Sequence, residues 1–356
     1  MSESTALPPT PSKSLVIRAV LRTDVGRVRS ENQDFGVLST REEEGRDGHP
    51  GGRLMIVADG MGGHRGGATA SRIATETVKA QYLGSETDDV ASALRDALTR
   101  ANARVFAEAQ SNPDLRGMGT TTSALVVRDD EAWFAHVGDS RIYLVRHDEI
   151  RQLTDDHSLV ASMVREGLLT AQEAENHPRR NVLQRSIGVS EEVEIDIRGP
   201  LKIEIGDTFI ICSDGLHGVV KEQEIRDVAR QSIEAAADEF IRRALERGAP
   251  DNVTVIVARA ERGGEGTAHL EETLVEHSDR AMFDDTVRDV PAPMLQPSSA
   301  TTSPGPAASP GEPVTAPEPA PSESRPGART RNPFLKWMFI VVMVLGFTGA
   351  WLYWIH

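Results

Sequence analysis

The chain has 356 residues, of which 39 % are hydrophobic and 26 % are charged, a composition typical of a globular protein with one large domain or two ordinary ones. The formal net charge of −15 argues against nucleic acid as a partner, because a surface that binds nucleic acid needs a basic field. The single cysteine excludes an intrachain disulfide and a four-cysteine zinc site.

The first 14 residues are polar and proline-rich and lack the apolar stretch of a signal peptide, so we expect a disordered N-terminus that stays in the cytosol. From residue 15 to residue 260, short β-rich runs alternate with longer alanine-rich helical patterns. The runs predicted as strands are 15–21, 53–59, 121–127, 132–138, 141–146, 191–199, 207–215 and 252–260. The predicted helices are 68–81, 88–110, a pair within 158–177, and 221–247 with a break near Gln231.

The order of these elements decides the fold class. Two strands precede two helices, a run of strands follows, and helices and strands complete the region. Regular βαβ units would produce a parallel sheet, whereas this order favours an α+β domain with two largely antiparallel sheets flanked by helices.

Residues 261–333 form a predicted disordered linker, because the first part is acidic with few apolar residues and the second part is rich in proline and alanine. Residues 334–356 follow as a predicted transmembrane helix. Nineteen of them, 337–355, carry no formal charge and would span roughly the ~30 Å of a bilayer core. Basic residues precede this span and only His356 follows it, so we expect a single-pass inner-membrane protein with its catalytic domain in the cytoplasm.

Five aspartate-bearing motifs stand out in residues 15–260. They are RSENQD (29–34), VADGMGGH (57–64), VGDSR (137–141), CSDGL (212–216) and DNVTVIV (251–257). Most of them place a carboxylate where a predicted strand ends or begins, and strand ends gather at one edge of a sheet. Converging carboxylates repel one another unless hard cations neutralise them, and an oxygen-only ligand set selects Mg²⁺, Mn²⁺ or Ca²⁺. Two such cations can activate a bridging water for phosphoryl displacement.

These motifs, with GTT (119–121) and the segment LTDDHS to HPRRNVLQRSIG (153–188), resemble the bacterial branch of the metal-dependent serine/threonine protein phosphatases, the PPM or type-2C family. The resemblance covers residues 17–260. It implies a β-sandwich of two antiparallel sheets flanked by helices, with the metals in a cleft at one end. It also implies direct attack on phosphorus by a metal-bridging hydroxide without a phospho-enzyme, so Cys212 is interpreted as a buried strand residue and not as a nucleophile.

The resemblance further implies two Mn²⁺ or Mg²⁺ ions per domain, with a third, weaker site in bacterial members. Asp59 matches the carboxylate that bridges the two metals, and Gly60 matches the residue whose carbonyl completes one site. Asp214 and Asp251 match the ligands of the other metal. Asp139 resembles the ligand of the third metal, shared with Asp214.

Two further residues take roles from the same resemblance. Asp34 matches the acidic residue that holds metal-bound water, and Arg29 matches the arginine that grips the substrate phosphate. The sequence departs from the eukaryotic pattern at Met61, where those members carry a histidine proposed as general acid. His64 is then either an acid or a loop residue, and Asn181 stands where some bacterial relatives carry a ligand of the third site.

Residues 154–188 resemble the flap beside the active site. Its arginines could contact acidic phosphopeptides, or they could be solvated surface residues; they are Arg165, Arg179, Arg180 and Arg185. The alternatives to a protein phosphatase are a hydrolase of small phosphoesters, a membrane-tethered pseudophosphatase that acts as a binding module, and a partner-switching phosphatase. Loss of ligands would mark a pseudophosphatase, and the ligand residues are all present.

The expected partners are phosphorylated proteins, above all bacterial Ser/Thr kinases and their substrates. The acidic part of the linker places a threonine after two acidic residues twice, at Thr273 in EETLVE and at Thr286 in FDDTVRD. Each threonine has an acidic residue three positions later. Phosphorylation of Thr286 or Thr273 would create a pattern that resembles a ligand for a forkhead-associated domain, although acidic linkers also contain such patterns by chance.

Overall fold

The computed structural model describes residues 15–40, 51–263 and 275–277. The strands are β1 (Leu15–Asp24), β2 (Asp34–Leu38), β3 (Arg53–Met61), β4 (Gly119–Thr120), β5 (Thr122–Arg128), β6 (Glu131–Val137), β7 (Arg141–Arg146), β8 (Glu149–Gln152), β9 (Asp196–Lys202), β10 (Thr208–Cys212), β11 (Val253–Arg262) and β12 (Val275–His277). The helices are α2 (Gly63–Leu83), α3 (Val90–Ser111), α4 (Leu159–Arg165), α5 (Ala171–Glu175), α6 (Asp214–His217), α7 (Glu222–Val228) and α8 (Ile233–Glu246), with a 3₁₀ turn, η1, at Pro113–Leu115.

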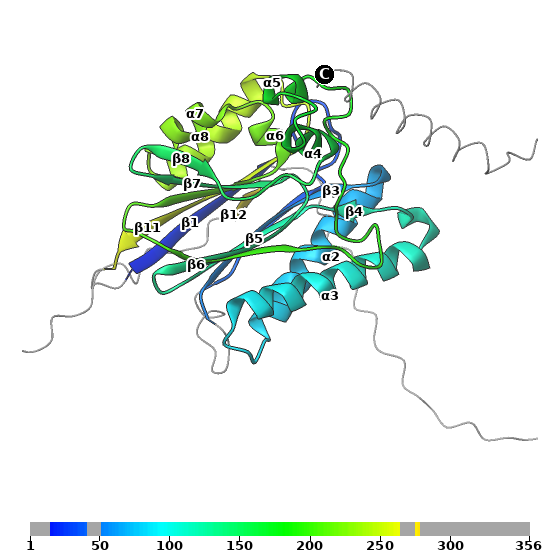
Figure 1. Cartoon of the computed structure of the whole chain (residues 1–356), viewed down its shortest axis with the longest axis horizontal. Coiled ribbons are helices and arrows are strands. Elements are labelled where there is room, and N and C mark those ends of the chain that lie inside the picture. The colour runs from blue at the N-terminus through cyan, green and yellow to red at the C-terminus, as the bar shows by residue number, and fades with distance from the viewer. Residues whose placement is uncertain (1–14, 41–50, 264–274, 278–356) are drawn as a thin grey trace, which may run out of the picture. The chain divides into compact units, whose positions relative to one another are not determined.

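The strands form two sheets. One has the order β12-β1-β11-β10-β7-β8 and the other has the order β2-β3-β5-β6-β9, with β4 paired to β3. Every pairing is antiparallel except that of β12, which runs parallel to β1. Figure 1 shows α2 and α3 on one side of the stacked sheets and α7 and α8 on the other. The predicted α+β class with antiparallel sheets flanked by helices is confirmed.

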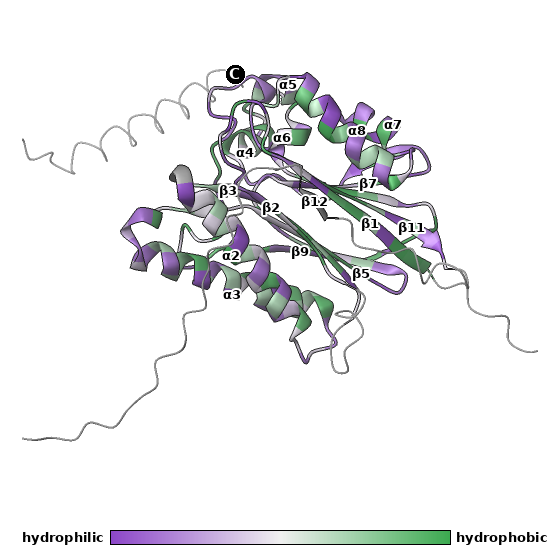
Figure 2. Cartoon of the chain, turned by 180° about the vertical axis from the view of Figure 1, so that it is seen from behind, coloured by the Kyte–Doolittle hydropathy of each residue, from purple (hydrophilic) through white to green (hydrophobic). Residues whose placement is uncertain are grey.

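Alternation along the strands builds the layers. On β3, Leu54 and Ile56 pack toward α2 and α3, whereas Met55 and Val57 pack between the two sheets. On β11, Ile256 and Ala258 enter the space between the sheets, whereas Val255 and Val257 face the layer that contains α8. Successive side chains of a strand point to opposite faces, so a strand covered on both faces is apolar almost throughout. Figure 2 shows this concentration of hydrophobic residues on the strands between the helix layers.

The two helix layers use small residues to pack closely. In α3 the buried positions include Ala93, Ala97 and Ala101, which recur at the three- and four-residue spacing of one helix face. The side chain of Asp89 begins this helix by accepting a hydrogen bond from the backbone N–H of Ala91 at 3.0 Å. Ser232 begins α8 in the same way by accepting from Ala235 at 3.2 Å.

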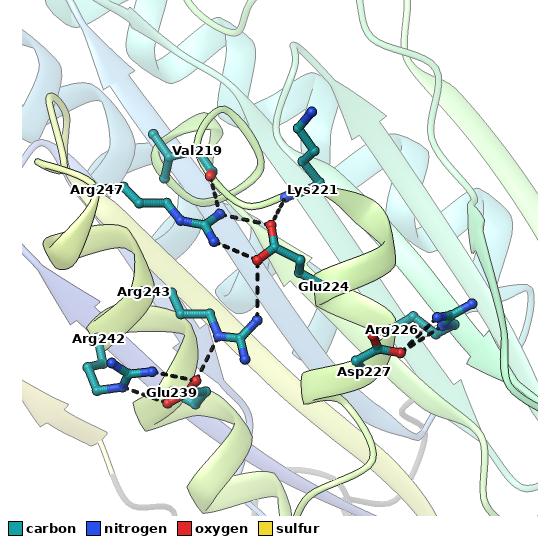
Figure 3. A network of polar contacts seen from close by, with 9 residues as sticks. All are labelled: Val219, Lys221, Glu224, Arg226, Asp227, Glu239, Arg242, Arg243 and Arg247. Carbon is teal, nitrogen blue, oxygen red and sulfur yellow. Dashed lines mark hydrogen bonds and ion pairs between the residues drawn. The ribbon is translucent and has the colours of Figure 1, made fainter.

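Ion pairs join α7 to α8 on the outer surface (Figure 3). Glu224 of α7 accepts from Arg247 at 2.5 Å and pairs with Arg243 at 3.5 Å, and Arg243 also binds Glu239 at 2.7 Å. These side chains are partly solvated, and exposed ion pairs contribute little to stability. They connect the start of α7 to the C-terminal half of α8 and lie among partly exposed side chains.

Several predicted elements differ from the structure. The predicted strand 207–215 ends at Cys212, because Ser213 takes the N-cap position of α6 and the helix begins at Asp214. Gly215 in this helix lies against the backbone of Asn252, where a Cβ would clash. The predicted strand 191–199 begins only at Asp196, since Val193 and Ile195 contact the core without belonging to the sheet. The short strands β2 and β8 were not predicted.

The C-terminal predictions concern residues that the structure largely does not describe. β11 ends at Arg262, two residues beyond the predicted domain end, and β12 lies within the predicted disordered linker. The rest of residues 264–333, with Thr273 and Thr286, lies outside the described residues, as does the predicted transmembrane helix 334–356. Among the described residues, no helix combines the length and the apolar character needed to cross a membrane.

Candidate active site

The predicted acidic residues meet at one end of the sandwich. Asp34 begins β2 and lies opposite Asp59 of β3 in the antiparallel register. Asp139 follows β6, Asp214 follows β10, and Asp251 precedes β11. A cleft of about 500 Å³ is lined by the predicted residues Arg29, Asp59, Gly60, Asp139, Asp214 and Asp251, with Asn181 and Leu183 from the flap. The sequence-based expectation that these motifs converge is therefore correct.

Asp34 lies behind the wall of this cleft. Its side chain is 6 % exposed and accepts a hydrogen bond from Ser213 Oγ to Oδ2 at 2.7 Å. Its other oxygen, Oδ1, is buried without a hydrogen-bond partner among the described residues. Burial raises the pKa of Asp34 to about 7, although the Ser213 bond lowers it.

Burial and mutual repulsion also act on the carboxylates in the cleft. Burial, followed by the charges of Asp34 and Asp214, holds the pKa of Asp59 well above its usual range. The pKa of Asp139 rises to about 8 through burial and the charge of Asp214. Burial and the charge of Asp251 raise the pKa of Asp214 to about 6, although the side-chain interaction with Asp59 and the charges of Arg29 and Arg180 lower it. The protein alone does not neutralise this set of charges.

The donor set fits hard divalent cations. The carboxylates and the Gly60 carbonyl offer oxygen only, and Asp214 Oδ1, like Asp34 Oδ1, is buried without a hydrogen-bond partner within the described part of the chain. Mg²⁺ and Mn²⁺ prefer such oxygen ligands, and their charge would reverse the repulsion that raises these pKa values. The unpartnered oxygens mark the atoms at which a cation or its water would bind.

The side chains that the structure describes do not form a complete set of metal ligands. Within residues 15–40, 51–263 and 275–277, no three His, Cys, Asp or Glu side chains are grouped closely enough to hold an ion. Arg29 Nη2 donates to Asp251 Oδ2 at 2.8 Å, so a predicted phosphate-binding group pairs with a predicted metal ligand. Both side chains are partly exposed, and such an ion pair contributes little to stability.

The loop of residues 25–33, which carries Arg29, is held at three points by one side chain that sequence reasoning missed. Asn252 is 4 % exposed. Its Nδ2 donates to the carbonyls of Val25 at 2.9 Å and Glu31 at 3.0 Å, and its Oδ1 accepts from the Gln33 N–H at 2.9 Å. The signal was present in the motif DNVT, in which the amide directly follows the predicted ligand Asp251.

Thr121 joins the segments that carry Asp59 and Asp139. Its hydroxyl accepts from the Asp59 N–H at 2.9 Å and lies 2.7 Å from Ser140 Oγ. The Thr121 N–H donates to the Asp59 carbonyl at 2.9 Å. Thr121 and Ser213 were also missed as site residues, although both stand inside the quoted motifs GTT and CSDGL.

The flap contains α4 and α5. Arg165 donates to the Asp156 carbonyl at 3.2 Å, and Arg185 pairs with Glu194 at 2.7 Å and with Asp196 at 3.0 Å. Arg179 and Arg180 are exposed. Of the four predicted flap arginines, Arg165 and Arg185 therefore hold the flap itself, whereas Arg180 lies near enough to Asp214 to lower its pKa.

The sequence also raised the roles of Met61, Cys212 and His64. Met61 lines the cleft at the position where a general-acid histidine was considered. Cys212 is fully buried and burial raises the pKa of its thiol to about 12, which suits a core residue and not a nucleophile. The side chain of His64 is outside what the structure describes.

Known proteins share this fold and sequence. A profile of the protein phosphatase 2C family matches residues 39–248. The chain belongs to this family. It is 38 % identical over 247 residues to the serine/threonine phosphatase stp of Listeria welshimeri, and the aligned region covers 68 % of this chain and 95 % of the relative.

Solved structures of the family agree. The serine/threonine phosphatase PstP/Ppp of Mycobacterium tuberculosis matches with a TM-score of 0.61 and 34 % identity, over 69 % of this chain and 99 % of that one. The catalytic domain of PstP in complex with two manganese ions matches with a TM-score of 0.60 and 33 % identity, over the same shares. The predicted membership of the PPM or type-2C phosphatases and the predicted PPM-type fold are confirmed.

Proposed function

We propose that this phosphatase 2C family member hydrolyses phosphoserine and phosphothreonine in proteins with the help of two Mn²⁺ or Mg²⁺ ions, and that Asp139 takes part in a third, weaker site. The observation that supports this most is that Arg29, Asp59, Asp139, Asp214 and Asp251 line the same cleft. When bound, the cations would lower the pKa of water and neutralise charge on the phosphate. The relative that contains two manganese ions supports Mn²⁺ as the first cation to test.

The residues of the chain have separate tasks in this scheme. Asp59 and Asp214 would hold the cations, with the Gly60 carbonyl and Asp251. Arg29 exchanges Asp251 for the substrate phosphate, to which its planar guanidinium can donate two hydrogen bonds. Asp34 does not line the cleft, so its task would be to hold water through Oδ1 while Ser213 fixes Oδ2.

The test is release of phosphate from phosphothreonine and phosphoserine peptides by the full chain in a mild detergent. We expect turnover with Mn²⁺, none with excess chelator, and none for Asp59→Asn. Turnover that continues in chelator, or in Asp59→Asn at saturating Mn²⁺, would refute the metal mechanism. Hydrolysis of p-nitrophenyl phosphate without hydrolysis of any phosphopeptide would favour small phosphoesters as substrates, and Mn²⁺ binding without any turnover would favour the pseudophosphatase.

The C-terminal segment supports a proposal on location. Residues 334–356 have the length and aromatic flanks of a membrane anchor, and the basic residues before them favour a catalytic domain on the cytoplasmic side of the inner membrane. If residues 278–333, which follow β12, behave as a flexible coil, they would let the domain move on the order of 40 Å from the membrane. Full-length protein that stays soluble after carbonate washing of membranes would contradict the anchor.

Such a tether suits membrane-bound Ser/Thr kinases and their substrates as partners. A kinase that phosphorylates Thr286 or Thr273 would also create a docking site for a forkhead-associated domain, where arginines bind the phosphate. Mass spectrometry of Asp59→Ala after incubation with an active kinase tests this, because the inactive variant cannot remove the mark. The proposal fails if neither threonine carries phosphate while the kinase phosphorylates itself.

A further inference from the structure

β12 comes from the predicted linker and lies against the sheet of the catalytic domain. It pairs in parallel with the end of β1, with Val275 opposite Leu21 and His277 opposite Thr23. Without β12, β1 would be the outermost strand of its sheet, because its other neighbour is β11. An edge strand leaves backbone N–H and C=O groups unpaired, so it can accept an added strand. The edge of β1 is therefore a docking surface whose occupant is a segment of the same chain.

The length of the connection permits this pairing. β11 ends at Arg262, which lies opposite Leu15 at the far end of β1. The chain must then return along β1 from Leu15 to Leu21, a distance of about 20 Å along a strand. Twelve residues separate Arg262 from Val275. They can span up to about 40 Å, so the linker reaches the edge of β1 with length to spare.

The three residues of β1 that β12 covers stand shortly before the loop that carries Arg29. β1 ends at Asp24, and the loop of residues 25–33 follows. The Thr23 hydroxyl accepts a hydrogen bond from Asn32 Nδ2 at 2.8 Å and lies 2.7 Å from Thr254 Oγ1. The position of Thr23 on β1 therefore helps to set the position of the returning end of the loop.

The start of the loop depends on the same strand end. Asp24 Oδ1 accepts from the Gly26 N–H at 2.8 Å, and Gly26 has a φ of +80°. A Cβ on Gly26 would lie 2.2 Å from the Asp251 carbonyl oxygen, so the loop passes close to the segment that carries a predicted metal ligand. A shift of the end of β1 would therefore move both ends of the Arg29 loop.

The contact of this strand end with α8 includes an exposed ion pair. Arg22 Nε donates to Asp238 Oδ1 at 2.7 Å, and the side chain of Asp238 is 61 % exposed. Such a pair contributes little to stability. β12 instead pairs with the backbone of Leu21–Thr23. Its loss would leave the outer N–H and C=O groups of these residues to water, which favours fraying at the end of the strand.

We propose that residues 275–277 are a positioning segment of the enzyme. By pairing with the edge of β1, they hold the end of this strand and thereby the Arg29 loop, which favours binding of the substrate phosphate. The functional catalytic unit then extends to residue 277, beyond the end of β11 at Arg262. The effect on substrate rests on the proposed function, whereas the pairing of the strands does not.

The experiment compares variants of the full chain in a mild detergent. The strand-breaking variant carries Val275→Pro together with Glu276→Pro. Alternate residues of a strand direct their N–H groups toward the same neighbour, so a pair of adjacent prolines removes a donor to β1. The matched control carries Leu270→Pro together with Glu271→Pro, which also changes one apolar and one acidic residue but lies before β12.

Two measurements are made. In metal-free protein, hydrogen exchange of the outward amides in the peptide 15–24 should be about fivefold faster in the strand-breaking variant than in the wild type and the control. With Mn²⁺, the KM for a phosphothreonine peptide should rise about threefold in the strand-breaking variant while kcat is unchanged. In an Arg29→Ala background the same proline pair should leave KM unchanged, because the residue that it positions is absent.

Equal exchange in the wild type and the strand-breaking variant would overturn the pairing and with it the proposal. Faster exchange without a change in KM would show that β12 covers the edge without positioning the loop. A rise in KM that also occurs in the control, or that persists in the Arg29→Ala background, would refute an action through Arg29. A wild type that hydrolyses no phosphopeptide would refute the proposed function and the effect on substrate, and the exchange rates would still test the pairing.

Discussion

Replacing Asn252 by alanine tests how the phosphate-binding loop is held. The substitution removes three hydrogen bonds, to the carbonyls of Val25 and Glu31 and from the N–H of Gln33. At about 1 kcal/mol for each bond, the chelated protein should lose about 3 kcal/mol of unfolding free energy. Because these bonds fix the loop that carries Arg29, the KM for a phosphopeptide should rise several-fold.

Urea unfolding of the chelated protein and steady-state kinetics with Mn²⁺ measure the two effects separately. Asn176→Ala is the matched control, since Asn176 is exposed and its side chain makes one 3.3 Å hydrogen bond within the flap. It should change the free energy of unfolding by less than about 0.5 kcal/mol. If Asn252→Ala unfolds within about 1 kcal/mol of the wild type and keeps its KM, the side chain does not hold the loop.

Three further results are expected. Asp59→Ala and Asp214→Ala should abolish phosphopeptide hydrolysis and weaken Mn²⁺ binding in calorimetry. Cys212→Ser should keep most of the activity, and a large loss of activity in this variant would contradict the direct mechanism. Arg29→Ala should raise KM at least tenfold, because it removes charge-assisted hydrogen bonds to the phosphate that contribute about 1.5–3 kcal/mol each. A defect confined to kcat would oppose a binding role. Burial raises the pKa of Asp34 to about 7 in the folded protein, so the stabilisation from its bound proton is complete below pH 4 and is lost as the pH rises through 7. The Tm of the chelated protein should therefore fall from pH 5 to pH 8. Mn²⁺ should raise the Tm more at pH 8 than at pH 5.

Most of the fold could be predicted from the sequence, because the long strands are continuous apolar runs and the helices repeat alanine and other apolar residues at helical spacing. β3 and β11 bury nearly all their residues, and the break between α7 and α8 falls near Gln231 as expected. The errors lie in short segments whose pattern of apolar residues does not distinguish a strand from a loop. β8 has four residues without a fully buried one, and the apolar residues before β9 contact the core without pairing in the sheet.

The ligand candidates could also be predicted, because each stands beside a turn at the end of an apolar run. The residues that hold them could not. Asn252, Ser213 and Thr121 act through hydrogen bonds to partners 19 to 227 positions away in the sequence, and such contacts cannot be predicted without the register of the strands. The Arg29–Asp251 ion pair could not be predicted for the same reason, since it joins residues 222 positions apart.

The buried carboxylates explain why these supporting residues are needed. Every acidic side chain at the site with a raised pKa has burial as its first cause and neighbouring negative charge as a further one, so the folded protein tolerates these groups at a cost in stability. Ser213 binds one carboxylate oxygen of Asp34, and Thr121 binds only the backbone N–H and carbonyl of Asp59, so neither occupies the remaining carboxylate oxygens. A site in which every oxygen were satisfied by the protein would be more stable and would have no atom left for a cation. The unpartnered oxygens of Asp34 and Asp214 are therefore the physical sign of function at this end of the sandwich, where strand ends have brought the charges together.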